Sequence, residues 1–148
     1  MAEIQQRLQG LSEEYQKLQQ GLMLSNRFLN SFRVKLIRAA ELQATVAARQ
    51  KLESQQQENK GVQTEFARLA EEAKIYKLVG PVLLKQEKTE AVLAVDGRLE
   101  YIEGDIKRVE KQIADIEEKS NKTRMEIMQI QTQMDAQQQG GQSAQAAA

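Results

Sequence analysis

The sequence contains no cysteine, no histidine and no tryptophan, and only one of its 148 residues is proline. The absence of imidazole and thiol groups removes the usual zinc ligands, the commonest catalytic base and the thiol nucleophile, and it excludes a disulfide framework. Aromatic residues make up 4% of the chain, and the mean hydropathy is −0.60. A core would therefore have to be built from aliphatic residues scattered among polar ones, which favours an elongated helical protein.

Charge and hydropathy argue against two classes of partner. The 21 basic residues are balanced by 21 acidic ones, whereas neutralising nucleic-acid phosphates requires an excess of lysine and arginine. No stretch approaches the ~18 consecutive apolar residues of a membrane span, and the first residues lack the basic and apolar regions of a signal peptide. We therefore expect a cytoplasmic protein that binds neither nucleic acid nor membrane.

No group of residues predicts catalysis. The acidic pairs Glu71-Glu72 and Glu117-Glu118 have no neighbours that would fix a ligand geometry, so we interpret them as solvated helix faces rather than as a metal or acid–base site. The sequence also has no glycine-rich loop of the nucleotide-binding type. We expect no catalytic residues, no metal, no cofactor and no enzymatic activity.

The second half of the chain carries a heptad pattern. Apolar residues alternate at spacings of three and four, and the same frame continues through Ser120 and Thr123. This pattern predicts a coiled-coil seam, which a single helix cannot bury alone. Thr89 is the expected N-cap of this helix, with Glu90 in its first turn. The predicted seam consists of Val92, Val95, Leu99, Ile102, Ile106, Val109, Ile113, Ile116, Ser120, Thr123, Ile127, Ile130 and Met134.

The first half carries two frames that are out of phase by one residue. One frame runs from Ile4 to Leu18 and the other from Leu42 to Ala73. Between them, residues 21–40 contain four basic residues, no acidic residue and no glutamine. Removing this segment would restore one continuous frame and would nearly equalise the two helical arms. We therefore hypothesise that the segment is an insertion, translated from a retained intron or a misplaced exon boundary.

The alternative for residues 21–40 is a basic amphipathic segment that contacts a membrane or a partner. Its apolar residues spread around the helix instead of forming one face, which favours the insertion over this alternative. Transcript sequences that join Gln20 directly to Glu41 would support the insertion.

The centre of the chain changes from a helical to a β-type pattern. Two short apolar runs flank Gly80-Pro81, which predicts a turn between two strands. The runs are more apolar than a helix-to-helix reversal requires, and a lone two-stranded hairpin is only marginally stable in water. We expect the hairpin to pair edge to edge with other subunits, and the alternative is a local cap on the helices. The residues assigned to assembly are Ile75, Tyr76, Leu78, Val79, Val82, Leu83 and Leu84.

Three segments, at residues 46–66, 75–87 and 95–113, resemble the beta-type subunits of prefoldin, a hexameric holdase chaperone. The most specific part is the central YKLVGPVLL, together with RQKLESQQQENK before it. The resemblance implies a mainly α-helical fold, in which two antiparallel coiled-coil arms are joined by a short β-hairpin.

The same resemblance implies a heterohexamer of two alpha-type and four beta-type prefoldin subunits, with the hairpins forming a platform above the coiled coils. It also implies that the complex captures unfolded actin and tubulin without ATP and passes them to the cytosolic chaperonin. The expected organisation is one domain at 1–136, made of a helical arm at 1–74, a β-hairpin at 75–88 and a helical arm at 89–136, followed by a disordered tail at 137–148.

In an antiparallel hairpin hinged near Gly80, the free ends of both arms would meet. If these ends fray, their apolar side chains become available to unfolded proteins, and nearby methionines suit a surface that accepts many sequences. Ordinary seam packing is the alternative, and it is favoured for Leu11 and Ile127. The expected client contacts are Ile4, Leu8, Leu11, Ile127, Ile130 and Met134.

A competing class is a structural or tethering coiled-coil protein that binds a partner helix through its seam. This class explains the heptads but gives the central β segment no role. Suppression of the aggregation of a denatured client would distinguish the chaperone from the tether.

Overall fold

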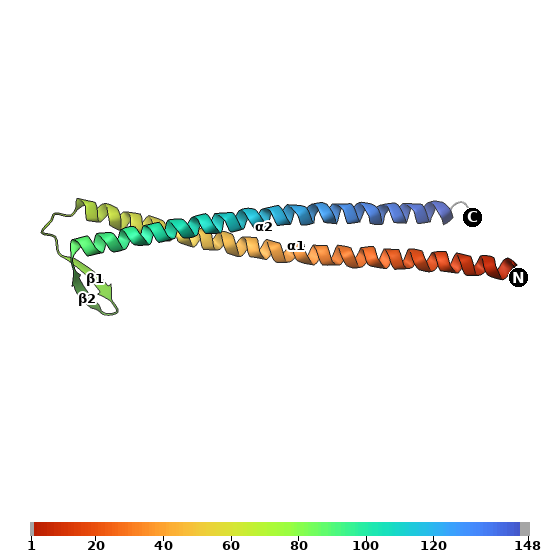
Figure 1. The fold of residues 1–148 in the computed structure, drawn as a ribbon, viewed down its shortest axis with the longest axis horizontal. Coiled ribbons are helices and arrows are strands. Elements are labelled where there is room, and N and C mark those ends of the chain that lie inside the picture. Colours follow the sequence, from red (N-terminus) through yellow and green to blue (C-terminus); the bar gives the residue numbers. More distant parts are fainter. Residues whose placement is uncertain (1, 146–148) are drawn as a thin grey trace. The chain divides into compact units, whose positions relative to one another are not determined.

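The computed structural model describes the backbone of residues 2–145 and the side chains of residues 3–139. Along the chain, a long helix is followed by a β-hairpin and then by a second long helix, which confirms the expected fold class (Figure 1). The elements are α1 (Ala2–Arg68), β1 (Ile75–Val79), β2 (Val82–Gln86) and α2 (Lys88–Gln145).

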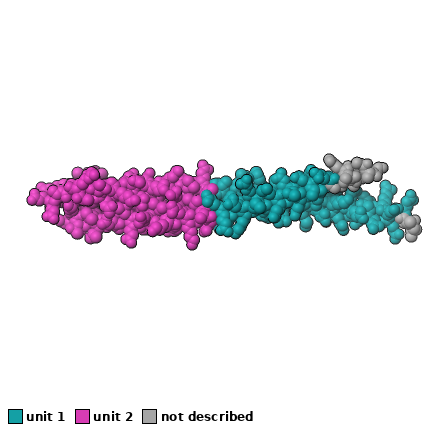
Figure 2. All heavy atoms as spheres, turned by 90° about the horizontal axis from the view of Figure 1, so that it is seen from above, with its two compact units in different colours: residues 1–41, 116–148 teal, residues 42–115 magenta. Residues whose placement is uncertain are grey.

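The chain forms two compact units, each of which contains a part of both helices (Figure 2). Unit 1 consists of residues 1–41 and 116–148, and unit 2 of residues 42–115. The heptad seam predicted for the second half is confirmed in both, because each of its thirteen positions is buried or half-buried. The helix α2 continues to Gln145, beyond the expected end of the arm at residue 136. The last three residues of the expected disordered tail lie outside the described residues.

In unit 2, polar contacts hold the two antiparallel helices in register beside their apolar seam. Arg49 lies on α1 with its guanidinium 2.9 Å from the carboxylate of Glu53 and 3.1 Å from that of Glu110 on α2. Nearer the hairpin, the side-chain amide of Gln63 donates a hydrogen bond to Asp96 at 2.7 Å. The contacts of Arg49 with Glu110 and of Gln63 with Asp96 fix which residues of α1 face which residues of α2.

The end of α1 and the start of α2 are joined by a capping contact. The ammonium of Lys88 donates to the backbone carbonyl of Leu69 at 2.8 Å, which satisfies one of the carbonyls that a helix end leaves without a partner. The helix ends at Arg68, ahead of the boundary expected at residue 74. Cation and carbonyl both lie in unit 2.

The N-cap expected at Thr89 is wrong, because α2 already begins at Lys88. The backbone N–H of Ala91 donates to the carbonyl of Glu87 at 3.0 Å, so Glu87 occupies the capping position. Glu90 lies in the first turn as expected, where a negative charge interacts favourably with the helix dipole.

The strands β1 and β2 pair antiparallel in the register set by a tight turn. Val79 pairs with Val82 across the turn, and Ile75 pairs with Gln86 at the open end. Gly80 has a φ of 59°, in the left-handed region that costs glycine least. The strand residues and the turn predicted from the sequence are both confirmed.

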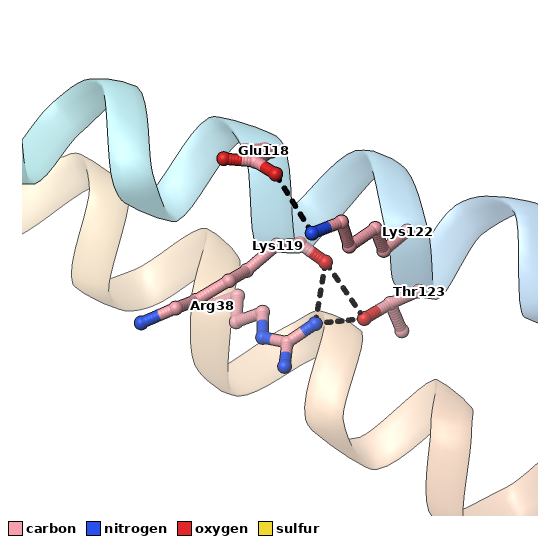
Figure 3. Close-up of polar contacts among 5 residues, drawn as sticks. All are labelled: Arg38, Glu118, Lys119, Lys122 and Thr123. Atoms are coloured by element: carbon pink, nitrogen blue, oxygen red, sulfur yellow. Dashed lines mark hydrogen bonds and ion pairs between the residues drawn. The ribbon is translucent and has the colours of Figure 1, made fainter.

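In unit 1, the segment 21–40 is a regular part of α1 and packs along α2. A polar layer joins the two helices, in which Arg38 donates one hydrogen bond to the carbonyl of Lys119 at 2.5 Å and another to the hydroxyl of Thr123 (Figure 3). Thr123 itself donates to the carbonyl of Lys119 at 3.0 Å and is only 5% exposed. A base from the segment 21–40 thus satisfies a polar position of the seam.

The expectation that the ends of the two arms meet is wrong. The last apolar positions of α2 lie beside residues 21–40 of α1, since Glu126 forms an ion pair with Arg27 at 3.6 Å. Ile130, one turn further along α2, is 1% exposed and is the most deeply buried apolar side chain in the described residues. Every described side chain from 3 to 20 is exposed. Because residues 21–40 of α1 occupy this position, Ile4, Leu8 and Leu11 do not lie beside the seam residues at the end of α2.

Replacing Ile130 by alanine should destabilise unit 1. Removing most of a fully buried aliphatic side chain loses its contacts and leaves a cavity, so we expect the free energy of unfolding to fall by about 2 to 4 kcal/mol. The measurement is urea unfolding of the full chain followed by circular dichroism. Met128→Ala is the matched control, because Met128 lies on the same helix and is 56% exposed. Equal losses for the two variants would contradict the packing described for unit 1.

Candidate functional site

The hairpin presents apolar side chains on both of its faces. Residues paired across the two strands share a face, so Leu78 and Leu83 lie on one face with Tyr76, while Val79 and Val82 lie on the other. Of the seven residues assigned to assembly, Ile75 is buried at 9% exposure. The other six are between 49% and 68% exposed, namely Tyr76, Leu78, Val79, Val82, Leu83 and Leu84.

The hairpin also presents its backbone. Within residues 2–145 the sheet has two strands, so each strand has one edge whose N–H and C=O groups have no ladder partner within the sheet. Figure 1 shows the strands standing away from the helices of unit 2. A small sheet that is apolar on both faces and open at both edges is suited to strand addition and burial by other chains. The alternative of a local cap on the helices would cover these six side chains, which are exposed.

The residues expected to contact clients fall into two groups. Ile4, Leu8 and Leu11 are 64%, 62% and 58% exposed on α1. On α2, Ile130 is buried, and the other two expected contacts, Ile127 and Met134, are half-buried. The structure does not bring the two groups together, and all three members are exposed only in the α1 group.

An open groove marks the place in unit 1 where the helices stop covering each other. It is lined from α1 by Gln20, Met23 and Leu24 and from α2 by Gln133, Ala136 and Gln137. Two methionines on the outer side of α2, Met125 and Met128, are 60% and 56% exposed. These features add an apolar, adaptable surface next to the buried Ile130.

In the part of the chain that the structure describes, the charged groups show no arrangement suited to catalysis. A hydrogen bond from Lys122, at 2.7 Å, and its positive charge lower the pKa of Glu118, and this i,i+4 pair on the outer face of α2 is of the kind that supports a helix. Among the described residues, no group of three or more acidic side chains could hold a metal ion. Within the same part of the chain, neither helix has the length of apolar sequence needed to cross a bilayer.

Sequence reasoning missed a third exposed apolar group. Leu22, Leu29, Phe32 and Leu36 of α1 are between 43% and 64% exposed. The signal was present in the sequence, because these residues continue the three-four spacing that starts at Ile4. It was missed because the apolar residues of 21–40 were judged to spread around the helix without forming a face.

Comparisons with known proteins agree with the fold and with the resemblance described above. The family profile described as Prefoldin subunit matches residues 39–134. The chain is 50% identical over 90 residues to prefoldin subunit 6 of Saccharomyces cerevisiae, covering 61% of this chain and 79% of that protein. It is 40% identical over 132 residues to prefoldin subunit 6 of Bos taurus, covering 88% and 87% of the two chains.

Among solved structures, the prefoldin beta subunit from Thermococcus strain KS-1 aligns with a TM-score of 0.66 and 24% identity, over 70% of this chain and 90% of that one. This likeness confirms the fold. The match to the prefoldin subunit family supports the expectation that the chain is not an enzyme. The profile match, the identity to curated relatives and the shared helix–hairpin–helix fold show that this chain belongs to the prefoldin subunit family.

Proposed function

We propose that this chain is a beta-type subunit of a cytoplasmic prefoldin heterohexamer, made of two alpha-type and four beta-type subunits. The complex captures unfolded actin and tubulin without ATP and transfers them to the cytosolic chaperonin. Family membership supports other prefoldin subunits as partners, and the names of the relatives support a role as a co-chaperone subunit. The clients, the chaperonin and the location in the cell are parts of the proposal.

The observation that carries the assembly step is the exposed hairpin. Exposure of six large apolar side chains on a two-stranded sheet is unfavourable in water. Covering them in an interface would stabilise the assembly by roughly 1.5 to 3 kcal/mol for each fully buried side chain. Free edges on both strands allow the sheet to be extended on either side. Hairpins from neighbouring subunits would pair with the free strand edges and cover the apolar faces. The backbone hydrogen bonds would align the strands, and burial of the apolar side chains would stabilise the contact.

The capture step is assigned to the end of α1. Ile4, Leu8 and Leu11 recur at a spacing that places them on one face of the helix, and all three are exposed. A short apolar face of this kind binds weakly and without strong sequence preference. Several such ends acting on one unfolded chain would hold it through effective concentration, so that each single contact can still release readily.

The contribution of α2 to capture requires an opening of unit 1. Ile130 is buried against α1, and Ile127 and Met134 are half-buried, so these residues would contact a client only when the end of α2 separates from residues 21–40. Met125 and Met128 are exposed without any such opening. We therefore assign first contact to the α1 end and these methionines, and later contact to the three seam residues.

The origin of residues 21–40 stays a prediction. The family profile begins to match at residue 39, next to the carboxyl end of this segment, which supports the idea that the segment is atypical of the family. Transcript sequences decide the question. Reads that join Gln20 to Glu41 would establish an inserted segment, and their absence would retain it as part of the protein.

Charged residues on the hairpin should abolish assembly. Leu78→Asp combined with Leu84→Asp places one carboxylate on each face of the sheet, where burial without a partner is costly. We expect the variant to be missing from hexamers purified after co-expression with the other subunits, as measured by native mass spectrometry. Leu93→Asp is the control, because Leu93 is a similarly exposed leucine on α2. Unchanged incorporation of the double variant would show that the hairpin does not mediate assembly.

Polar residues at the end of α1 should weaken client capture without changing assembly. We expect a reconstituted hexamer carrying Ile4→Ser, Leu8→Ser and Leu11→Ser to suppress the aggregation of denatured actin a few-fold less well, because the remaining arms still contribute by avidity. Light scattering during dilution from denaturant measures the effect, and Tyr101→Ser, at an exposed position of α2, is the control. A reconstituted complex that never suppresses aggregation would instead favour the tethering protein.

A further inference from the structure

A continuous apolar face runs along α1 from residue 4 to residue 36, entirely within unit 1. Its nine large side chains recur at spacings of three and four, with Ser25 as the one small member of the series. We call this face the α1 stripe. Each large member is between 43% and 72% exposed, and together they are Ile4, Leu8, Leu11, Tyr15, Leu18, Leu22, Leu29, Phe32 and Leu36.

The α1 stripe is distinct from the face with which α1 packs on α2. In residues 21–40 the side chains turned toward α2 are buried or half-buried, and they include Leu24, Phe28, Ser31 and Val34. The stripe members Leu29 and Phe32 follow Phe28 and Ser31 by one residue, which rotates them by about 100° around the helix axis. The helix therefore has two apolar faces over this length, and α2 covers only one of them.

The size of the α1 stripe matches what an interface requires. Nine large side chains at this degree of exposure leave on the order of 900 Å² of surface, close to the ~800 Å² that each partner buries in a standard interface. Alternation at spacings of three and four over more than four heptads is the pattern of a helix that packs on another helix. A partner helix is thus better matched to the stripe than a globular surface or an irregular chain.

We propose that the α1 stripe binds the α1 stripe of a second copy of this chain in antiparallel orientation, a contact that excludes client binding at Ile4, Leu8 and Leu11 while it persists. One register brings all nine large residues of each copy into the contact, and its two-fold axis passes beside Gln20. In this register the layers pair Leu18 with Leu22, Tyr15 with Ser25, Leu11 with Leu29, Leu8 with Phe32 and Ile4 with Leu36, each layer occurring twice by symmetry.

Side-chain size favours the antiparallel register over a parallel one. The antiparallel register places Tyr15, the largest residue in the first half of the stripe, against Ser25, the smallest in the second half. A parallel pair would place tyrosine on tyrosine and serine on serine, which overfills one layer and leaves another incompletely packed.

The net charge of the two halves of the segment favours the same orientation. Residues 1–20 carry three acidic and two basic side chains, whereas residues 21–40 carry four basic side chains and no acidic one. The antiparallel register places the more acidic half of each copy beside the basic half of the other. A parallel pair would place the two basic halves side by side, and halves of like net charge oppose association.

At the flanks of the stripe, by contrast, the antiparallel register places like charges together, in one contact that occurs twice by symmetry. Arg7 and Lys35 flank the stripe at equivalent heptad positions, and the antiparallel register brings Arg7 of one copy close to Lys35 of the other. In a parallel pair Lys35 would lie near Ala40 and would have no charged neighbour across the contact. This difference provides a test of orientation that does not depend on disrupting the fold.

Disulfide cross-linking tests the register directly, because the natural chain has no cysteine. Two full-length variants are prepared, Leu18→Cys and Leu22→Cys. We expect mild oxidation to give a covalent dimer when the two variants are mixed, and little dimer with either variant alone, because only the mixture places two cysteines in one layer. Cross-linking of each variant with itself would indicate a parallel pair and would overturn the proposal.

Charge reversal gives a second, independent test. We expect Lys35→Glu to tighten the dimer roughly three- to tenfold, since it replaces two repulsive contacts by two ion pairs, and Arg7→Glu to do the same. The double variant Arg7→Glu, Lys35→Glu should return to about the wild-type dissociation constant, measured by analytical ultracentrifugation. Single effects that simply add in the double variant would contradict the proposed contact.

Both tests are repeated in chains carrying Leu78→Asp and Leu84→Asp, so that association through the hairpin cannot be mistaken for association through the stripe. Leu18→Asp should then give a monomer, and Leu93→Asp, outside unit 1, should leave the dimer unchanged. A chain that stays monomeric at all accessible concentrations overturns the proposal. So does protection of the cysteine at position 18 by a denatured client but not by a second copy, since the stripe would then be a client surface.

Discussion

A helix with one apolar face cannot bury that face by itself, so α1 and α2 must pair with each other. The rest of this structure depends on that pairing. The buried interior is a seam only two helices wide, so few side chains become fully inaccessible, and Ile102, Val109 and Ile130 carry much of the apolar burial. Stability in such a seam is distributed along its length. A buried polar position in such a seam is costly unless it finds a partner locally. Arg38 meets this need at Thr123.

The pairing also explains the position and exposure of the hairpin. Two antiparallel helices must be connected where α1 ends and α2 begins, and the cap from Lys88 to Leu69 fixes these two ends together. The connection is longer and more apolar than a reversal needs, and the thin seam offers no surface broad enough to cover it. Its side chains therefore remain exposed on both faces. A connection with free edges on both strands is a natural point of contact for further subunits.

Local pattern was sufficient to predict the α2 seam, the two strands and the turn, because each depends on periodicity or on the conformational preference of a few neighbouring residues. The end of α1 and the start of α2 were not predicted correctly, since Leu69 and Lys88 are distant in sequence and their contact exists only in the folded unit. For a similar reason, the sequence could not show which of the expected client contacts at the ends of the arms are exposed and which are buried. Exposure at Ile4 and burial at Ile130 depend on the relative lengths of the two helices, which no local pattern contains.

In residues 21–36, one apolar face of α1 is buried against α2 while a second apolar face stays exposed. The stripe members Leu22, Leu29 and Phe32 form the more apolar face, yet the face that contains Ser31 and Arg38 packs on α2. Helical phase provides the reason: the frame of residues 42–73 extends back before residue 42 without a break in the helix, and a continuous helix cannot shift its phase by one residue without losing that frame. Arg38 reinforces the choice because it has polar partners on α2. The more apolar face is consequently left in solvent, an arrangement that becomes favourable only when another helix covers it.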